Sequence, residues 1–214
     1  RVAGIDSDVV ARALPGKMSP IPMSVQRILT DARGQGRTPT PRMLDCWMIE
    51  PVSKSARDIW IWGAGHVGRA LVAAVSPLPD VRIMWADSAR DRFPEDMQGI
   101  EPLIAENPAD LAPLAAPHAE HFVLTYSHAL DLEICHRVLG RPFGSLGLIG
   151  SATKWARFRS RLKSLGHAES QIDRIQCPIG DPGLGKHPQA IALGVATEIV
   201  RRGKRGAVLN SKRA

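Results

Sequence analysis

The sequence predicts an α/β protein with a Rossmann-like parallel sheet, helices on both faces of that sheet, and a short irregular N-terminal segment before it. Three observations lead to this fold class. A glycine-rich turn joins an apolar run to an amphipathic segment, a second apolar run ends in an acidic residue, and strands then alternate with helices along the chain. Helices between successive strands indicate that the strands run parallel.

Composition narrows the classes of function. The 214 residues carry a net charge of +7 and 44% are hydrophobic, which is typical of a soluble globular protein with an anionic ligand or partner. Basic strands with interleaved aromatic residues are missing, so no nucleic acid is expected as a partner. No apolar run approaches the roughly eighteen residues of a membrane span, and no signal-peptide pattern opens the chain, so no membrane partner is expected.

Cysteine and histidine spacing predicts no metal site. Cys46, Cys135 and Cys177 form no CxxC pair, which argues against a disulfide framework or a zinc site and favours a reducing, cytoplasmic location. His118 and His121 stand three residues apart beside a predicted strand, where they would point to opposite faces. We therefore expect no metal ligands, and we expect Cys46 and Cys135 to act as small hydrophobic residues.

Three regions are expected along the chain. Residues 1–57 are interpreted as the tail of a preceding domain plus a linker, 58–203 as the Rossmann-like domain, and 204–214 as a frayed basic tail. The first residue is arginine rather than methionine, which suggests a piece of a longer protein. In the first region we expect a short helix over 24–32, capped by Ser24, and one extended apolar segment over 42–52 that contains Cys46.

The glycine-rich turn after the strand 59–62 is the first candidate for ligand binding. Gly63 permits the sharp turn, Gly65 lets a ligand phosphate approach the backbone, and Gly68 lets the following helix lie close to the strand. The N-terminus of that helix offers N–H groups and a partial positive charge to an anion. His66, where the helix begins, either touches the ligand or is exposed to solvent.

Asp87 ends the next apolar strand, 81–86, close to where a dinucleotide-binding fold carries its ribose-binding acid. The alternative is that Asp87 only forms the turn at the end of the strand. A polar loop over 88–98, a short strand over 102–105 and a weak helix over 108–115 are expected to follow.

A second candidate follows the strand 120–125. Ser127, His128 and Asp131 would lie at the carboxyl end of this strand, where open α/β sheets bind ligands. Their hydroxyl, imidazole and carboxylate groups suit a polar ring or a ribose. The alternative is that Ser127 caps the following helix and Asp131 stabilises its first turn.

A third candidate follows the strand 145–149. Gly150 and Ser151 turn the chain into a helix over 152–165, and Lys154 in the first turn makes a second anion site. The basic residues farther along this helix are expected to form a solvated face: Arg157, Arg159, Arg161 and Lys163.

The glycine- and proline-rich loop 177–188 leads into a final helix that begins at Pro188. This loop either closes over the carboxyl edge of the sheet, with Lys186 toward an anion, or only connects two elements.

Four blocks of the sequence resemble the Rossmann domain of the XdhC-type xanthine dehydrogenase accessory proteins. In chain order they are Gly63-Ala64-Gly65-His66-Val67-Gly68-Arg69-Ala70-Leu71, then Ser127-His128-Ala129-Leu130-Asp131, then Gly147-Leu148-Ile149-Gly150-Ser151 with Arg157-Phe158, and finally Cys177-Pro178-Ile179-Gly180. Two features depart from the family pattern. The family's glycine-rich N-terminal domain is absent or reduced to its tail, and His187 stands where threonine is expected before the proline.

The resemblance implies a role as an accessory protein rather than an enzyme. Such a protein binds the molybdenum cofactor (molybdopterin), protects it while a cysteine desulfurase or other sulfurase replaces an oxo ligand by sulfur, and delivers it to xanthine dehydrogenase. The resemblance also implies a homodimer in the bacterial cytoplasm. We expect no catalytic residue, and the expected cofactor-binding residues are Gly63, Gly65, His66, Gly68, Asp87, Ser127, His128, Asp131, Gly150, Ser151 and Lys154.

Two alternatives remain open at this point. The first is an NAD(P)-dependent oxidoreductase, for which the sequence offers little: the only tyrosine, Tyr126, has no lysine four residues later, and no acid–base pair stands out. The second is a regulatory module that senses a nucleotide and has no affinity for molybdopterin.

Overall fold

The computed structural model describes residues 2–3, 9–14, 20–35, 39–51, 56–97 and 99–211. Contacts within the chain define two compact units, of which the larger spans Ala56–Asn210 and the smaller takes in Arg1–Ser55. The linker expected before residue 58 lies mostly outside the described residues. None of the helices in the described ranges is long and apolar enough to cross a bilayer.

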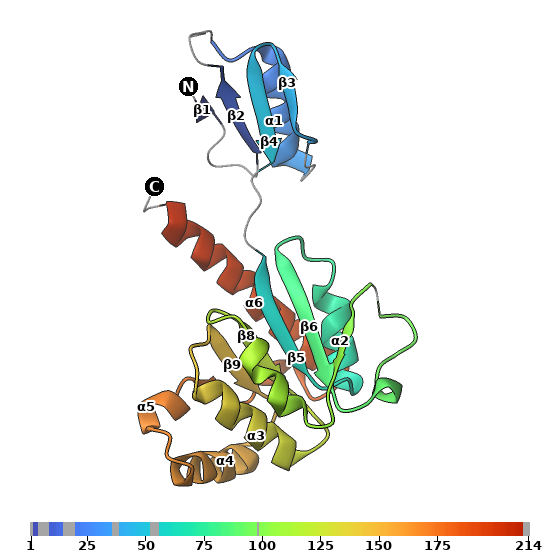
Figure 1. Ribbon diagram of the computed structural model, residues 1–214, viewed down its shortest axis with the longest axis vertical. Helices are drawn as coiled ribbons and strands as arrows, with labels where there is room; N and C mark the ends of the chain where they lie inside the picture. Colours follow the sequence, from blue (N-terminus) through green and yellow to red (C-terminus); the bar gives the residue numbers. More distant parts are fainter. Residues whose placement is uncertain are drawn as a thin grey trace. The chain divides into compact units, whose positions relative to one another are not determined.

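The larger unit is built on a six-stranded sheet, which confirms the predicted Rossmann-like fold (Figure 1). All of its strand pairs are parallel, and the strand order is β10-β9-β8-β5-β6-β7. The strands are β5 (Arg57–Trp62), β6 (Val81–Asp87), β7 (Pro102–Ile104), β8 (Glu120–Val123), β9 (Ser145–Leu148) and β10 (Ile175–Gln176).

Helices cover both faces of this sheet. The α-helices are α2 (His66–Val75), α3 (His128–Leu139), α4 (Ala152–Ser164), α5 (Glu169–Ile172) and α6 (Pro188–Ser211), and the short 3-10 helices are η1 (Arg90–Arg92), η2 (Pro108–Leu114) and η3 (Pro182–Leu184). One apolar cluster joins the sheet to α2 and α6, and another joins it to α3 and α4.

The packing of the central strand β5 explains why its second part, residues 59–62, is apolar without interruption. Successive side chains of a strand point to opposite faces. Ile59 and Ile61 therefore pack under α2 and α6, whereas Trp60 and Trp62 pack under α3 and α4. Because helices cover both faces, none of the positions 59–62 is left for a solvent-facing polar residue.

Charged side chains tie α6 to the amino ends of the central strands. Arg57 Nε donates a hydrogen bond to Glu120 Oε1 at 2.9 Å, and Arg57 Nη1 donates to the carbonyl oxygen of Ile199 at 2.9 Å. Arg202 on α6 donates to Ser145 Oγ at 2.6 Å. This network pairs the polar groups at the amino ends of the strands. We therefore expect ligand-binding groups at the opposite, carboxyl ends.

Three elements of the larger unit differ from the sequence-based expectation. The segment expected as a weak helix over 108–115 is a 3-10 helix, η2, that contains Pro113, a residue without a backbone N–H to donate. Helix α6 continues to Ser211, so the tail expected to fray from residue 204 is helical as far as that residue. The short elements α5 and β10 were not predicted because each is too brief to show a period.

The smaller unit contains more regular structure than the sequence analysis expected. Its antiparallel sheet has the order β1-β2-β4-β3, and α1 packs against it around Val25 and Leu29. The elements are β1 (Val2–Ala3), β2 (Val9–Ala13), α1 (Met23–Gln35), β3 (Arg42–Leu44) and β4 (Trp47–Pro51). Their buried residues, among them Trp47 and Ile49, form a core separate from that of the parallel sheet.

Two details of this unit correct the expectations. Of the segment expected to be extended over 42–52, the described residues 42–51 form a hairpin, because Asp45 and Cys46 adopt φ values of 49° and 64° and turn the chain back. Cys46 therefore lies in a turn. Helix α1 begins at Met23, so Ser24 is inside the first turn, where its hydroxyl donates to Asp45 Oδ2 at 2.5 Å instead of capping the helix.

Candidate functional site

The point where the strand order reverses lies between β5 and β8. From β5 the chain moves outward to β6 and β7, and then returns to β8 on the other side of β5. Open α/β sheets bind ligands at the carboxyl ends of the strands at such a point. The glycine-rich turn follows β5, and the turn that contains Ser127 follows β8, so two of the three predicted candidates lie here.

Gly63 and Gly68 are required by close packing. Gly63 has a φ of +117°, and a Cβ at this residue would lie 2.6 Å from the carbonyl oxygen of Leu124. A Cβ on Gly68 would collide with the carbonyl oxygen of Gly63. The turn after β5 is thus packed directly against the chain that leaves β8.

Gly65 differs from these two glycines. It is exposed and takes the N-cap position of α2, and no atom lies within 4 Å of a Cβ built on it. The backbone at Gly65 therefore borders open space next to the free N–H groups at the start of α2, where an anion is stabilised.

Asp87 is buried and both of its carboxylate oxygens are in use. Oδ2 accepts a hydrogen bond from the backbone N–H of Ala64 at 2.6 Å, and Oδ1 accepts one from the N–H of Ser88 at 2.7 Å. Arg92 Nε lies 2.9 Å from Oδ1. With 1% of the residue exposed, this carboxylate holds the glycine-rich turn in place.

Two arginines that were not predicted connect the loops at this edge. Arg69 donates from Nε to the carbonyl oxygen of Ala64 at 2.9 Å and from Nη2 to that of Arg92. The guanidinium of Arg92 lies 3.8 Å from the ring centroid of Tyr126, a cation–π contact. Arg69 directly follows the glycines in the sequence, whereas nothing in the sequence near Arg92 signals its role.

Asp131 joins the loop after β8 to helix α4. Its Oδ1 accepts hydrogen bonds from the backbone N–H and the hydroxyl of Thr125, at 2.9 and 2.8 Å. Its Oδ2 lies 2.6 Å from Lys154 Nζ, which also donates to the carbonyl oxygen of Ile149 at 2.7 Å. Asp131 is 0% exposed and Lys154 is 9% exposed. This fully hydrogen-bonded pair fixes the loops after β8 and β9 to each other.

Gly150 leaves room for the Lys154 side chain to reach Asp131. A Cβ on Gly150 would lie 2.8 Å from Lys154 Cδ and 3.3 Å from Cys177 Sγ. Burial raises the pKa of the Cys177 thiol, and the nearby Lys154 only partly offsets that effect. Burial also raises the pKa of Cys135, which is 0% exposed. Both thiols therefore stay protonated at neutral pH, which agrees with the expectation that Cys135 acts as a small hydrophobic residue.

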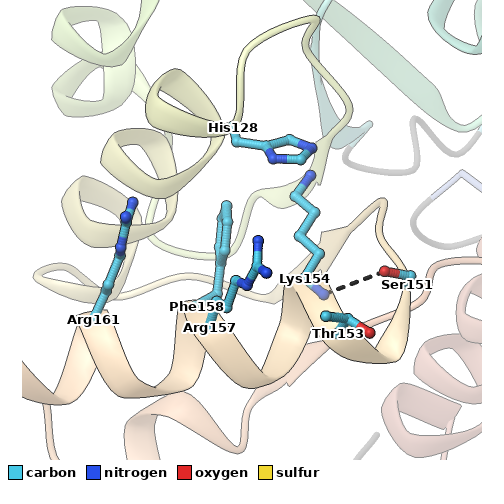
Figure 2. Close-up of a pocket in the computed structure, with 7 residues that line it drawn as sticks. All are labelled: His128, Ser151, Thr153, Lys154, Arg157, Phe158 and Arg161. Carbon is cyan, nitrogen blue, oxygen red and sulfur yellow. Dashed lines mark hydrogen bonds between the residues drawn. The ribbon is translucent and has the colours of Figure 1, made fainter.

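A pocket of about 340 Å³ lies between α3 and α4 (Figure 2). It is lined by His128, Ser151, Thr153, Lys154, Arg157, Phe158 and Arg161. Figure 2 shows Lys154, Arg157, Phe158 and Arg161 extending from the same side of α4, with His128 opposite Lys154. Ser151 caps α4 by accepting a hydrogen bond from the N–H of Lys154 at 3.2 Å.

A second pocket, of about 370 Å³, lies where α2 meets the start of α6. Its lining includes His66, Arg69 and Pro188. The loop before α6 thus comes close to the helix that follows the glycine-rich turn. Lys186, although exposed, lines neither of the two pockets described here.

The structure divides the predicted site residues into three groups. Gly65 and His66 are exposed beside the first turn, while His128, Ser151 and Lys154 line the α3–α4 pocket. The others hold loops in place: Gly63, Gly68, Asp87, Ser127, Asp131 and Gly150. Ser127 caps α3 by accepting a hydrogen bond from the N–H of Leu130 at 3.3 Å.

Arg157 and Arg161 are functional candidates that the sequence analysis left out. They were expected to belong to a solvated face, and they are indeed exposed, yet both line the α3–α4 pocket. Their spacing from Lys154, three and seven residues, places all three on one side of a helix. That spacing was a usable signal, but it does not show whether another helix lies opposite.

Comparison with known proteins agrees with the fold. A family model described as "XdhC Rossmann domain" matches residues 59–199. "Uncharacterized protein YqeB" of Escherichia coli (strain K12) is 32% identical over 141 residues, which cover 65% of this chain and 26% of that protein. A crystal structure titled "xanthine dehydrogenase (BH1974) from Bacillus halodurans" has a TM-score of 0.59 at 21% identity, covering 73% of this chain and 45% of that one. The chain thus spans about a quarter and just under half of these two proteins.

Proposed function

Since the chain belongs to the XdhC family, we propose that it binds the molybdenum cofactor, protects it during sulfuration and delivers it to a xanthine dehydrogenase. In this proposal a cysteine desulfurase or other sulfurase supplies the sulfur, and the chain acts as a homodimer in the cytoplasm. The role is that of an accessory protein rather than an enzyme.

The observation that carries the proposal is the open space at Gly65. The neighbouring glycines are packed against backbone, so the turn is rigid, but a side chain at Gly65 would meet nothing within 4 Å. A rigid turn at the sheet's reversal point, with free N–H groups beside it, suits the phosphate of a pterin cofactor.

The residues present fit such a cofactor in part. Gly65 and His66 would hold one phosphate at the start of α2, and Ser151 and His128 would contact the ligand across the sheet edge. Asp87 is assigned no ligand contact in this proposal, because it is buried and its oxygens already interact with Ala64, Ser88 and Arg92. Asp87, Asp131 and Lys154 instead position the loops around the ligand.

When bound, the molybdenum centre supplies the redox chemistry of the enzyme that receives it. The residues of this chain bind the cofactor, orient it and limit the access of water. Burial raises the pKa of both the Cys135 and the Cys177 thiol, and neither is proposed to ligate the metal.

The test is anaerobic equilibrium binding of molybdenum cofactor to the full chain, with NAD and NADP measured in parallel. The Gly65→Val variant should lose cofactor binding because the new side chain fills the open space beside α2. Gly34→Val is the matched control, since a Cβ at Gly34 also meets no atom within 4 Å but lies in α1 of the other unit. If Gly65→Val binds molybdenum cofactor as tightly as Gly34→Val does, the proposed site is wrong.

A nicotinamide-dependent oxidoreductase is the second candidate, and the strand order favours it because dinucleotide-binding sheets share that order. In that case NAD or NADP binds and molybdenum cofactor does not. Steady turnover of small alcohols or ketones with either nucleotide would then support the oxidoreductase and contradict the accessory role.

A further inference from the structure

We propose that the α3–α4 pocket binds a phosphate or diphosphate group of a small-molecule ligand. For the identity of the ligand this inference rests on the proposed function. The assignment of the pocket to a phosphate or diphosphate rests only on the residues that line it.

Arg157 and Arg161 are the groups that make this pocket an anion site. Neither has an acidic partner in the part of the chain that the structure describes. Arg159, between them on α4, donates to Asp173 at 2.7 Å and to Glu169 at 3.2 Å. Arg159, which faces α5, is thus paired with acidic residues, whereas the two arginines that face the pocket can bind an anionic ligand.

The charge inside the pocket is positive. No carboxylate is among the lining residues, and the charge of Lys154 is balanced by Asp131 at 2.6 Å. The two guanidinium groups therefore supply the net positive charge. Arginine suits a phosphate or diphosphate because its planar group donates two parallel hydrogen bonds. Four residues apart on one helix, the two side chains are neighbours that converge on one ligand group.

The size of the pocket suits a small-molecule ligand. The pocket volume of about 340 Å³ is within the range of small-molecule sites, about 300 to 1,000 Å³.

The experiment measures binding of inorganic pyrophosphate to the full chain by calorimetry at near-physiological salt. The pocket variant is Arg157→Gln with Arg161→Gln. Its control is Arg159→Gln with Lys163→Gln, which removes the same charge from the same helix but from side chains that pair with Glu169. We expect the pocket variant to raise the Kd at least about tenfold and the control to change it less than about twofold.

Two outcomes would overturn the inference: an equal loss of affinity in both double variants, which would indicate only general attraction to a basic surface, and no saturable binding of pyrophosphate to the wild-type chain. An acidic protein as the true partner of this face would give the second outcome. Should the double variant melt below the wild type, the two single variants take its place, and each is expected to raise the Kd about threefold.

The same titrations separate this inference from the proposed function. If pyrophosphate binds and only the pocket variant weakens its binding, while molybdenum cofactor does not bind, the anion site is supported and the accessory role is contradicted. If both ligands bind and the pocket variant loses affinity for both, the anion site and the proposed function are both supported.

Discussion

Asp131 and Lys154 form an ion pair that is almost completely removed from solvent, with 2.6 Å between Oδ2 and Nζ. The pair connects α3 to α4, and its remaining hydrogen bonds go to Thr125 and Ile149. Removing one partner leaves a buried charge without its counterion, so Asp131→Asn or Lys154→Met should lower the free energy of unfolding by about 3 to 5 kcal/mol.

Urea unfolding of both single variants and the double variant measures this effect. The double variant should be destabilised by clearly less than the sum of the singles. The exposed pair Glu133 and Arg137, 3.2 Å apart, is the control, and breaking it should cost less than about 1 kcal/mol. Additive losses in the buried pair would contradict the coupling.

Replacing Gly65 or Gly68 by alanine should lower the stability of the protein by different amounts. Gly68→Ala places a Cβ against the carbonyl oxygen of Gly63, so the backbone must shift, at a cost of about 1 to 3 kcal/mol. Gly65→Ala meets no neighbour and should cost no more than about 1 kcal/mol, the usual loss when alanine takes an N-cap position. Thermal unfolding of the two variants checks this, and equal destabilisation would show that Gly65 is also packed.

Asp87→Asn should destabilise the protein even without any ligand. An amide has one oxygen, which cannot replace both carboxylate oxygens toward Ala64 and Ser88. We expect a loss of about 1 to 3 kcal/mol in urea unfolding. Asp91→Asn, an exposed acid in η1, is the control with little expected effect. Unchanged stability together with weaker nucleotide binding would instead support the ribose-binding role.

His121 should make the stability depend on pH. Burial lowers its pKa to about 4, and Arg141 adds to that effect, while an unfolded imidazole titrates near about 6.5. Between these values the unfolded chain binds a proton that the folded protein does not. Stability is therefore lost as the pH falls from about 6.5 to about 4, on the order of 3 kcal/mol in total.

Comparing His121→Gln with wild type across that pH range isolates the effect, because the variant should lack this part of the pH dependence. Trp62 Nε1 donates to His121 Nδ1 at 3.2 Å, so the substitution also lowers stability at neutral pH, and the slope rather than the absolute value is the readout. His118→Gln, at an exposed position, should leave the slope as it is. An unchanged slope in His121→Gln would refute the prediction.

Sequence alone determined the parallel sheet and its first turn. Apolar runs that alternate with amphipathic helices, and glycines between the first strand and helix, are local patterns that one chain segment displays by itself. The predicted strand at 59–62 and helices after Gly65, Ser127 and Ser151 accordingly appear in the structure as β5, α2, α3 and α4. The short α5 and β10, and the hairpin at Asp45, were missed because they are too short or depend on unusual φ values.

Only the tertiary structure decided which candidate side chains remain available to a ligand. Asp87 and Asp131 looked alike in the sequence, as acids near strand ends, but both are buried and each is bonded to a residue 23 positions away. Arg157 and Arg159 also looked alike, and only the placement of α5 and α3 pairs one and leaves the other in the pocket. A local pattern specifies the direction of a side chain, whereas its partner is specified by the packing of distant elements.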